Sequence, residues 1–342
     1  MDILTKKNYY KPFLLWQLSI IILLILMIVI GGLTRLTDSG LSITQWNLIS
    51  GIFPPLNDSK WQEVFSLYKE IPQFFLINKN ITLSEFKIIY YWEYIHRLLG
   101  RLIGLIFLLP FIYFTYKKVI SKKYQILLSL VFLLICFQGF IGWYMVMSGL
   151  VTDVTVSHYR LSLHLFLAFI ILSINIWIFM NLINSTDKKF FISLYNDKKL
   201  FLFIILLYLQ VVIGAFVSGL DAGKVYQTWP LMNTSFFPNE IKLNNFFLLF
   251  NFKDHGFVQF IHRNIAYIIF LQIIFIGFRL FTERKNNLYK IYSIVLILIF
   301  LQIFLGIFAL LSDVNIFIAI GHQISSIFLI ICSLNLHYKA AH

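Results

Sequence analysis

The sequence EYIHR at residues 93–97 and the sequence QFIHR at residues 259–263 are two copies of one pattern, and each stands at the head of a long apolar run. A further histidine, His164 or His322, follows each copy by sixty to seventy residues. Because ionisable side chains are costly in hydrocarbon, four histidines at matching positions of apolar helices indicate a functional site.

Eight apolar runs are long enough to cross a bilayer, whose hydrocarbon core of about 30 Å needs about 20 helical residues. These runs cover residues 13–32, 90–115, 124–146, 160–183, 200–217, 257–280, 289–311 and 315–337. Hydrophobic residues make up 59% of the chain. The sequence therefore predicts an all-α polytopic membrane protein.

Basic residues concentrate in alternate loops between these runs. The N-terminus, the turns at 117–123 and 279–290, the segment 184–199 and the C-terminal tail hold 16 of the 28 basic residues but only 4 of the 15 acidic ones. The positive-inside rule then predicts that both termini are cytoplasmic. The first run is long enough to span and has no small-residue cleavage site, so we expect a bacterial inner-membrane protein without a cleavable signal. Nucleic-acid binding is not expected, because the basic residues flank the spans and form no single patch.

The chain also contains an internal repeat. Residues 30–55 align with 213–238 at a constant offset of 183 and are identical at eight of 26 positions, and the two histidine patterns align at an offset of 166. The repeat predicts an N-terminal four-helix half (1–183, with a long outer loop at 33–89), a cytoplasmic linker (184–199) and a C-terminal four-helix half (200–342). Because each half has an even number of spans, the two four-helix bundles should be related by a pseudo-two-fold axis along the membrane normal.

The four histidines all follow the outer ends of spans that run inward, which predicts that they lie in the outer leaflet. Paired helical imidazoles suit haem iron, so we expect His96 with His164, and His262 with His322, as two sets of axial ligands. Zinc would favour cysteine or carboxylate ligands, and a di-iron site would need several paired glutamates. His158 is an alternative to His164 as a ligand, but His164 lies deeper in its apolar run.

Glu93 is the predicted catalytic residue. It precedes His96 by three residues, which places both side chains on one helix face, and a carboxylate there can act as an acid or a base. The corresponding residue of the second half is the neutral Gln259. The alternative is a surface glutamate that is stabilised by the helix dipole.

Arginines near the histidines are candidates to bind haem propionates, because the guanidinium fork matches a carboxylate. The alternative for arginines near helix ends is that they extend to the membrane interface. The candidates are Arg35, Arg97, Arg101 and Arg263.

One amphipathic stretch, Ser59 to Ile71, lies in the long outer loop and ends before Pro72. Its apolar residues recur at helical spacing, which predicts a helix. We expect this helix to lie on the membrane surface over the first histidine pair. A simple spacer is the alternative.

Taken together, these motifs resemble those of haem A synthases. The resemblance rests on the two histidine patterns, on GGLTRLTDSGLS at residues 31–42, on GLDAG at 219–223 and on TWPLM at 228–232, and it covers nearly the whole chain. The chain is most similar to the proteobacterial and mitochondrial branch, without the outer-loop cysteine pair of some bacterial members. Its two cysteines, Cys136 and Cys332, lie inside spans.

The resemblance implies an oxidoreductase that oxidises the C8 methyl group of haem O to a formyl group, giving haem A for terminal oxidases. It implies a haem b cofactor at His262 and His322, and haem O or haem A as substrate or product at His96 and His164. Haem O synthase (protohaem farnesyltransferase), oxidase assembly factors, membrane lipid and an unnamed electron-transfer partner are the implied partners, and a homo-oligomer is left open.

Two rival functions would use some of the same features. A di-haem b cytochrome that moves electrons between quinol and a partner would need the same four histidines, but it gives no reason for the Glu93/Gln259 difference. A transporter with parallel repeats gives no reason for paired histidines in the outer leaflet.

Overall fold

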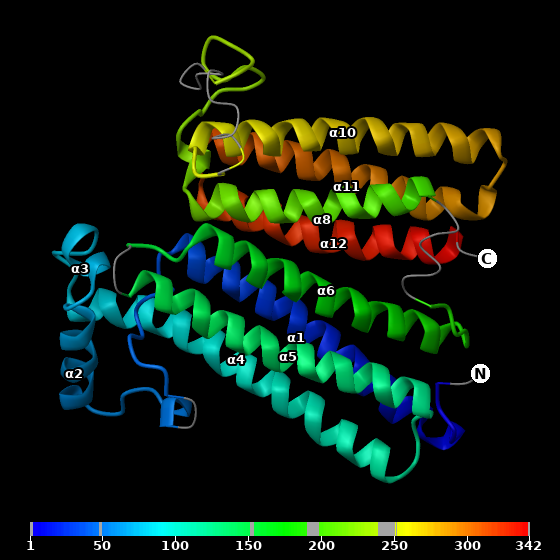
Figure 1. The fold of residues 1–342 in the computed structure, drawn as a ribbon, viewed down its shortest axis with the longest axis horizontal. Helices are drawn as coiled ribbons and strands as arrows, with labels where there is room; N and C mark the ends of the chain where they lie inside the picture. Colours follow the sequence, from blue (N-terminus) through cyan, green and yellow to red (C-terminus); the bar gives the residue numbers. More distant parts are fainter. Residues whose placement is uncertain are drawn as a thin grey trace. The chain divides into compact units, whose positions relative to one another are not determined.

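Eight long apolar helices make up most of the computed structural model of the chain (Figure 1). The structure describes residues 3–47, 50–150, 154–189, 198–238, 250 and 252–340. Seven of the eight expected spans lie within one of these helices, and the eighth, 315–337, begins one residue before its helix, so the all-α membrane fold is confirmed. The helices are listed with their bounds: α1 (Tyr10–Leu36), α4 (Leu83–Tyr116), α5 (Lys122–Gly149), α6 (His158–Ile183), α8 (Lys198–Gly219), α10 (His255–Thr282), α11 (Asn286–Leu311) and α12 (Ile316–Ala340).

The chain forms two compact units, Leu4–Ile171 and Met1–Ile3 together with Leu172–His342. The boundary between the units lies within α6, whereas half of the linker expected at 184–199, residues 190–197, lies outside the described residues. The tandem halves and their pseudo-two-fold axis therefore stay predictions, and each unit is described by itself.

In the unit Leu4–Ile171, α1 packs against α4, and α4 packs against α5. The helix α4 begins with a capping box, in which the Thr82 hydroxyl accepts a hydrogen bond from the Glu85 amide and the Glu85 carboxylate accepts one from the Thr82 amide. Its 34 residues span about 51 Å, more than the hydrocarbon core needs. The N-terminal turns of α4 therefore extend beyond the hydrocarbon core, where they contact the outer segment between α1 and α4.

This outer segment covers residues 37–82, a shorter range than the expected 33–89, because α1 and α4 extend beyond their apolar runs. It contains α2 (Asp58–Tyr68) and α3 (Pro72–Leu76), so the helix expected after Ser59 is confirmed. The apolar face of α2, formed by Trp61, Phe65 and Tyr68, is buried in a cluster with Phe86 and Tyr90 of α4. This face packs against protein, which differs from the membrane-surface position that we expected.

Burial raises the pKa of the Tyr68 hydroxyl, which therefore stays protonated. It donates to Gln73 Oε1 at 3.0 Å, and Gln73 Nε2 donates to the backbone oxygen of Asp38 at 3.1 Å. The α2–α3 segment is thus tied to the residues that follow α1.

At the other end of the same unit, the N-terminal segment pairs with the turn between α4 and α5. Leu4 forms an antiparallel bridge with Ile120, and Lys6 Nζ donates to the backbone oxygen of Lys117 at 2.7 Å. The structure therefore brings together two of the basic segments that the charge pattern assigns to one side of the membrane.

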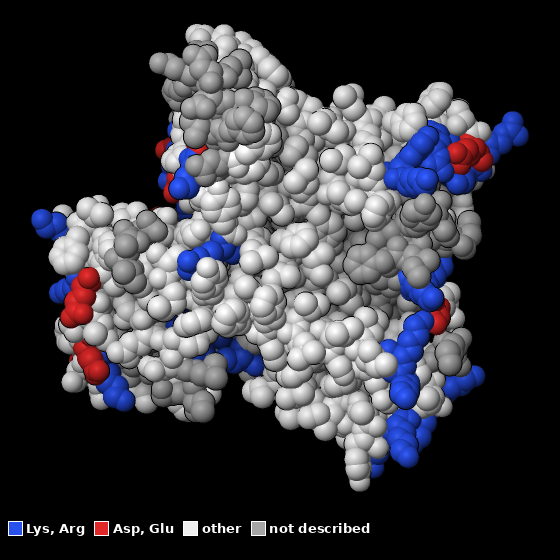
Figure 2. Space-filling view, viewed as in Figure 1, with Lys and Arg blue, Asp and Glu red and all other residues white. Residues whose placement is uncertain are grey.

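In the second unit, α8 packs against α10, and α11 packs against α12 (Figure 1). Basic side chains gather at the turn between α10 and α11, around the ion pairs of Glu283 with Arg279 and Lys285 (Figure 2). The side chains of α10 and α11 that point away from the unit are mostly apolar, such as Phe278 and Ile297. This distribution is expected for helices that face lipid.

Candidate functional site

Each unit contains one pair of facing histidines. In the first unit, the ring centroids of His96 on α4 and His164 on α6 are 6.5 Å apart. In the second unit, His262 on α10 and His322 on α12 are also 6.5 Å apart. A metal–imidazole bond of about 2 Å, with about 1 Å more to the ring centroid, places two rings on opposite sides of one ion about 6 Å apart. Both pairs therefore fit one metal ion between two imidazoles.

The histidine rings keep unused hydrogen-bonding capacity. Within the described part of the chain, the Nδ1 atoms of His96, His164 and His262 are buried and have no hydrogen-bond partner. The Nδ1 atom of His322 lies 3.1 Å from the backbone oxygen of Gln302. A buried polar atom without a partner is costly, and such atoms indicate a functional role or a bound group.

Each histidine ring lies against a glycine of the preceding membrane helix. A Cβ atom added to Gly31 would lie 2.9 Å from His96 Cε1, and one added to Gly214 would lie 3.1 Å from His262 Cε1. The other two pairs are Gly142 with His164 at 3.1 Å and Gly306 with His322 at 3.0 Å. Any larger residue would displace the ring, so these four glycines define where the imidazoles lie.

The depth of the histidines is similar on all four helices. His96 lies 20 residues before the last residue of α4, and the other three lie 18 to 20 residues before the ends of α6, α10 and α12. At a rise of about 1.5 Å per residue this is about 27–30 Å, or one hydrocarbon thickness. Each histidine therefore lies near one boundary of the apolar layer.

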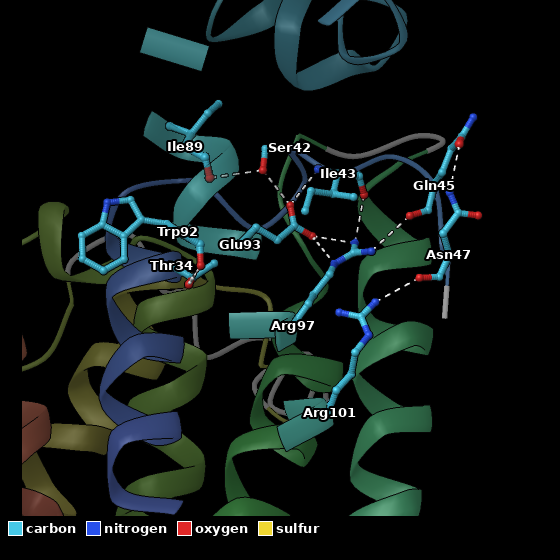
Figure 3. Close-up of polar contacts among 10 residues, drawn as sticks. All are labelled: Thr34, Ser42, Ile43, Gln45, Asn47, Ile89, Trp92, Glu93, Arg97 and Arg101. Atoms are coloured by element: carbon cyan, nitrogen blue, oxygen red, sulfur yellow. Dashed lines mark hydrogen bonds and ion pairs between the residues drawn. The ribbon is translucent and has the colours of Figure 1, made fainter. Parts of the chain in front are cut away.

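Glu93 is part of a buried polar cluster beside His96 (Figure 3). Its side chain is 4% exposed, and Glu93 Oε2 accepts hydrogen bonds from the Ser42 hydroxyl and the Ile43 amide, both at 2.8 Å. Its Oε1 atom accepts from Arg97 Nε at 3.0 Å and from Arg97 Nη2 at 2.6 Å. The carboxylate is therefore held in one position by four donors.

Arg97 extends the same cluster toward the outer segment. Its Nη2 atom donates to the Ile43 oxygen at 2.9 Å, its Nη1 atom donates to the Gln45 oxygen at 3.1 Å, and its guanidinium lies 4.8 Å from the Trp46 ring. Glu93 and Arg97 thus fasten the segment after α1 onto α4.

The second unit has the same arrangement with a neutral residue in place of the carboxylate. Gln259 Nε2 and Arg263 Nη2 both donate to the Tyr226 oxygen at 3.0 Å, and Arg263 Nη1 donates to the Leu231 oxygen at 3.3 Å. In both units the residues three before and one after the histidine therefore fasten an outer segment. The units differ in charge, because only the first holds a carboxylate there.

The two remaining candidate arginines also contact outer segments. Arg35 forms an ion pair of 2.9 Å with Asp38, and Arg101 Nη2 donates to the Asn47 oxygen at 3.0 Å. The four arginines that the sequence selected therefore lie near the histidine ends of their helices. The structure shows them holding loops, and propionate binding stays a prediction.

The structure places His164 opposite His96, and it places the other candidate, His158, against the Tyr159 ring with 4.0 Å between ring centroids. Among the described residues, no group of three or more histidine, cysteine, aspartate or glutamate side chains could hold a metal ion.

The glycine contacts are the main feature that the sequence interpretation missed. The repeat had already paired Gly31 with Gly214 and Gly142 with Gly306. Each glycine lies in the apolar run before a histidine helix, so its presence in both halves was a signal of close helix contact.

Comparisons with known proteins show the family to which the chain is related. A family model described as cytochrome oxidase assembly protein matches residues 14–334. A haem A synthase of Pelagibacter ubique is 45% identical over 97% of both chains. Haem A synthases of Flavobacterium psychrophilum and Rickettsia africae are 42% and 44% identical, over 92% of this chain and 93% and 94% of their own.

Proposed function

The chain belongs to the cytochrome oxidase assembly protein family, and from this membership we propose that it is a haem A synthase. It is an oxidoreductase that converts haem O into haem A for the assembly of cytochrome oxidase. The observation that carries the proposal is the presence of two histidine pairs at 6.5 Å, in a chain whose curated relatives share this activity over their full length. The chemical change is the oxidation of the C8 methyl group of haem O to a formyl group.

The two pairs are proposed to have different roles. His262 and His322 hold a resident haem b, and His96 and His164 hold the haem that is oxidised. A haem iron between two imidazoles supplies one-electron transfer. The difference between Glu93 and Gln259 supports this division, because only the first pair has a fixed carboxylate nearby. The division of roles is also supported by the α2–α3 segment, because α2 packs against α4, the helix that carries His96.

Glu93 is proposed to act in the oxidation from its fixed position. Four donors hold its carboxylate oxygens in place one helical turn from His96. Arg97 and Arg263, with Arg35 and Arg101, are proposed to bind propionates, because the guanidinium group matches a carboxylate.

We call the four glycines that contact the histidine rings, Gly31, Gly142, Gly214 and Gly306, the seating glycines. Mutating one of them is expected to weaken haem binding in its own half. In Gly306→Ala, the new methyl group would meet His322 Cε1 at 3.0 Å, and overpacking of this kind costs enough to lower haem b affinity about tenfold. Gly321→Ala is the matched control on the same hairpin, because its Cβ would meet Leu305 at an ordinary 3.9 Å. Haem extracted per mole of protein is the measurement. Equal haem b in the two variants would contradict the seating role.

The chain is a multi-pass membrane protein, and we propose that it lies in the inner membrane with cytoplasmic termini and with both histidine pairs toward the outer face. The pairing of the N-terminal segment with the 117–120 turn supports this orientation. The tandem halves 1–183 and 200–342, joined by the linker 184–199, are part of the same proposal, as are haem O synthase and oxidase assembly factors as partners.

A reporter that is active only outside the cytoplasm tests this orientation. Fused after Lys118, it should be inactive, because that turn carries basic residues and contacts the N-terminal segment. Fused after Lys79, between α3 and α4, it should be active. The reverse pattern would overturn the topology together with the outer position of both histidine pairs.

A further inference from the structure

Three of the four histidines contact a glutamine of the neighbouring helix. Gln138 Nε2 donates to the His164 backbone oxygen at 2.8 Å, and Gln210 Nε2 donates to the His262 backbone oxygen at 3.0 Å. Gln210 Nε2 also lies 3.3 Å from His262 Nε2, and Gln302 Nε2 lies 3.3 Å from His322 Nε2.

These glutamines share one position relative to the seating glycines. Each glutamine precedes its glycine by four residues, in the pairs Gln138 and Gly142, Gln210 and Gly214, and Gln302 and Gly306. Residues four apart lie on one face of a helix. The glycine and the glutamine of each pair therefore contact the same histidine. The glycine lies against the histidine ring, and the glutamine lies one helical turn earlier on the same helix.

The fourth histidine has a different neighbour at this position. Four residues before Gly31 is Met27. A Cβ added to Gly100, one turn after His96, would lie 3.4 Å from the Met27 methyl group. Met27 therefore fills the space beside His96 that glutamine fills beside the other three histidines.

The two side chains differ in what they can do for a histidine. A glutamine amide donates hydrogen bonds, and Gln302 is itself fixed by the Ser325 hydroxyl, which donates to its Oε1 atom. Methionine has no N–H group and has a flexible, polarisable side chain. The glutamine bonds to the backbone oxygens of His164 and His262 remain possible when the ring nitrogens bind iron, and they restrain the helix that carries the histidine, whereas methionine only fills volume.

This inference rests on the proposed function, because it assumes that the four histidines bind haem iron. We propose that Gln138, Gln210 and Gln302 are positioning residues that keep their histidines on the iron. Met27 leaves His96 as the one imidazole of the four that can leave its iron.

The consequence is a difference in reactivity between the two halves. Both histidines of the second half are restrained by glutamine, as suits a haem that only transfers electrons. In the first half, release of His96 opens a coordination position near Glu93, while Gln138 keeps His164 in place.

Carbon monoxide is the probe, because it binds reduced haem only where an axial ligand has left. The second half is measured alone in full-length protein that carries both His96→Ala and His164→Ala, because this protein lacks both imidazoles of the first pair and should keep only haem b. Adding Gln210→Met to this protein should raise the fraction of haem that binds carbon monoxide about fivefold, the factor expected for the loss of one net hydrogen bond. Gln272→Met is the matched control, because this amide bonds the Lys199 oxygen about 15 Å further along α10.

The first half is measured with Met27→Gln in the otherwise unchanged chain. The haem that binds carbon monoxide in excess of the value for the His96→Ala and His164→Ala protein should fall about fivefold, because the new amide can bond the His96 carbonyl. An unchanged fraction in Met27→Gln, or equal fractions in Gln210→Met and Gln272→Met, would overturn the inference. If Gln210→Met does not assemble, Gln302→Met applies the same test to His322.

Failure of the proposed function would give a different result. Haem content, measured by extraction before carbon monoxide is added, reports whether the His96→Ala and His164→Ala protein keeps haem b at all. Loss of that haem would refute the division between the halves, whereas retention with the wrong carbon monoxide response would refute only the role of the glutamines and Met27.

Discussion

The Glu93→Gln protein is expected to keep its haem and to form haem A about a hundredfold more slowly, the lower end of what a positioned acid or base contributes. Glutamine has nearly the shape of glutamate, so its oxygen can still accept from Ser42 and Ile43. The negative charge beside Arg97 is lost, and the first half then carries the residue that the second half has at Gln259. Haem A formed in cells, per mole of purified protein, is the measurement.

Glu93→Ala is the less informative variant. Both variants remove the ion pair with Arg97, but Glu93→Ala also removes the acceptor of the Ser42 hydroxyl and the Ile43 amide, so it would disrupt the whole buried cluster. Glu85→Gln is the better control, because it removes a carboxylate from the start of the same helix at an exposed position. Normal haem A formation by Glu93→Gln would end the catalytic assignment.

The second large effect is expected from His262→Ala. It removes one of two axial imidazoles from the proposed haem b site, so haem b should be lost almost completely. Ligand binding stabilises a folded protein by about 3–4 kcal/mol when the ligand is present at 100 to 1,000 times its dissociation constant. The variant should therefore also unfold at a clearly lower temperature.

His255→Ala is the control for this prediction. His255 is the first residue of α10, about two turns before His262, and its substitution removes an imidazole from the same helix without touching the pair. Normal haem b in His262→Ala protein would show that the second pair does not hold the resident haem.

The sequence predicted the parts of this protein that depend on periodicity and composition. Eight apolar runs became eight helices, because a span must satisfy its backbone hydrogen bonds internally. The pairing of His96 with His164 also followed from the sequence, since span order and histidine depth limit which imidazoles can meet.

The details that the sequence did not predict depend on contacts between distant residues. Glu93 and Arg97 were assigned separate roles, yet they form one ion pair that fastens residues 42–45, because α4 continues outward past its apolar run. The burial of Trp61 against Tyr90 has the same cause. Sequence spacing shows which side chains lie on the same face of a helix. It gives no information about the segment that will cover that face.

The central claim is that one histidine pair holds a substrate and the other holds a cofactor, and haem composition tests it most directly. Haems extracted from the purified chain, produced in cells that make haem O, would be separated by chromatography and counted per mole of protein. The account predicts haem O or haem A together with one haem b. Two haem b molecules per chain, with neither haem O nor haem A, would contradict it and would indicate a di-haem electron-transfer cytochrome.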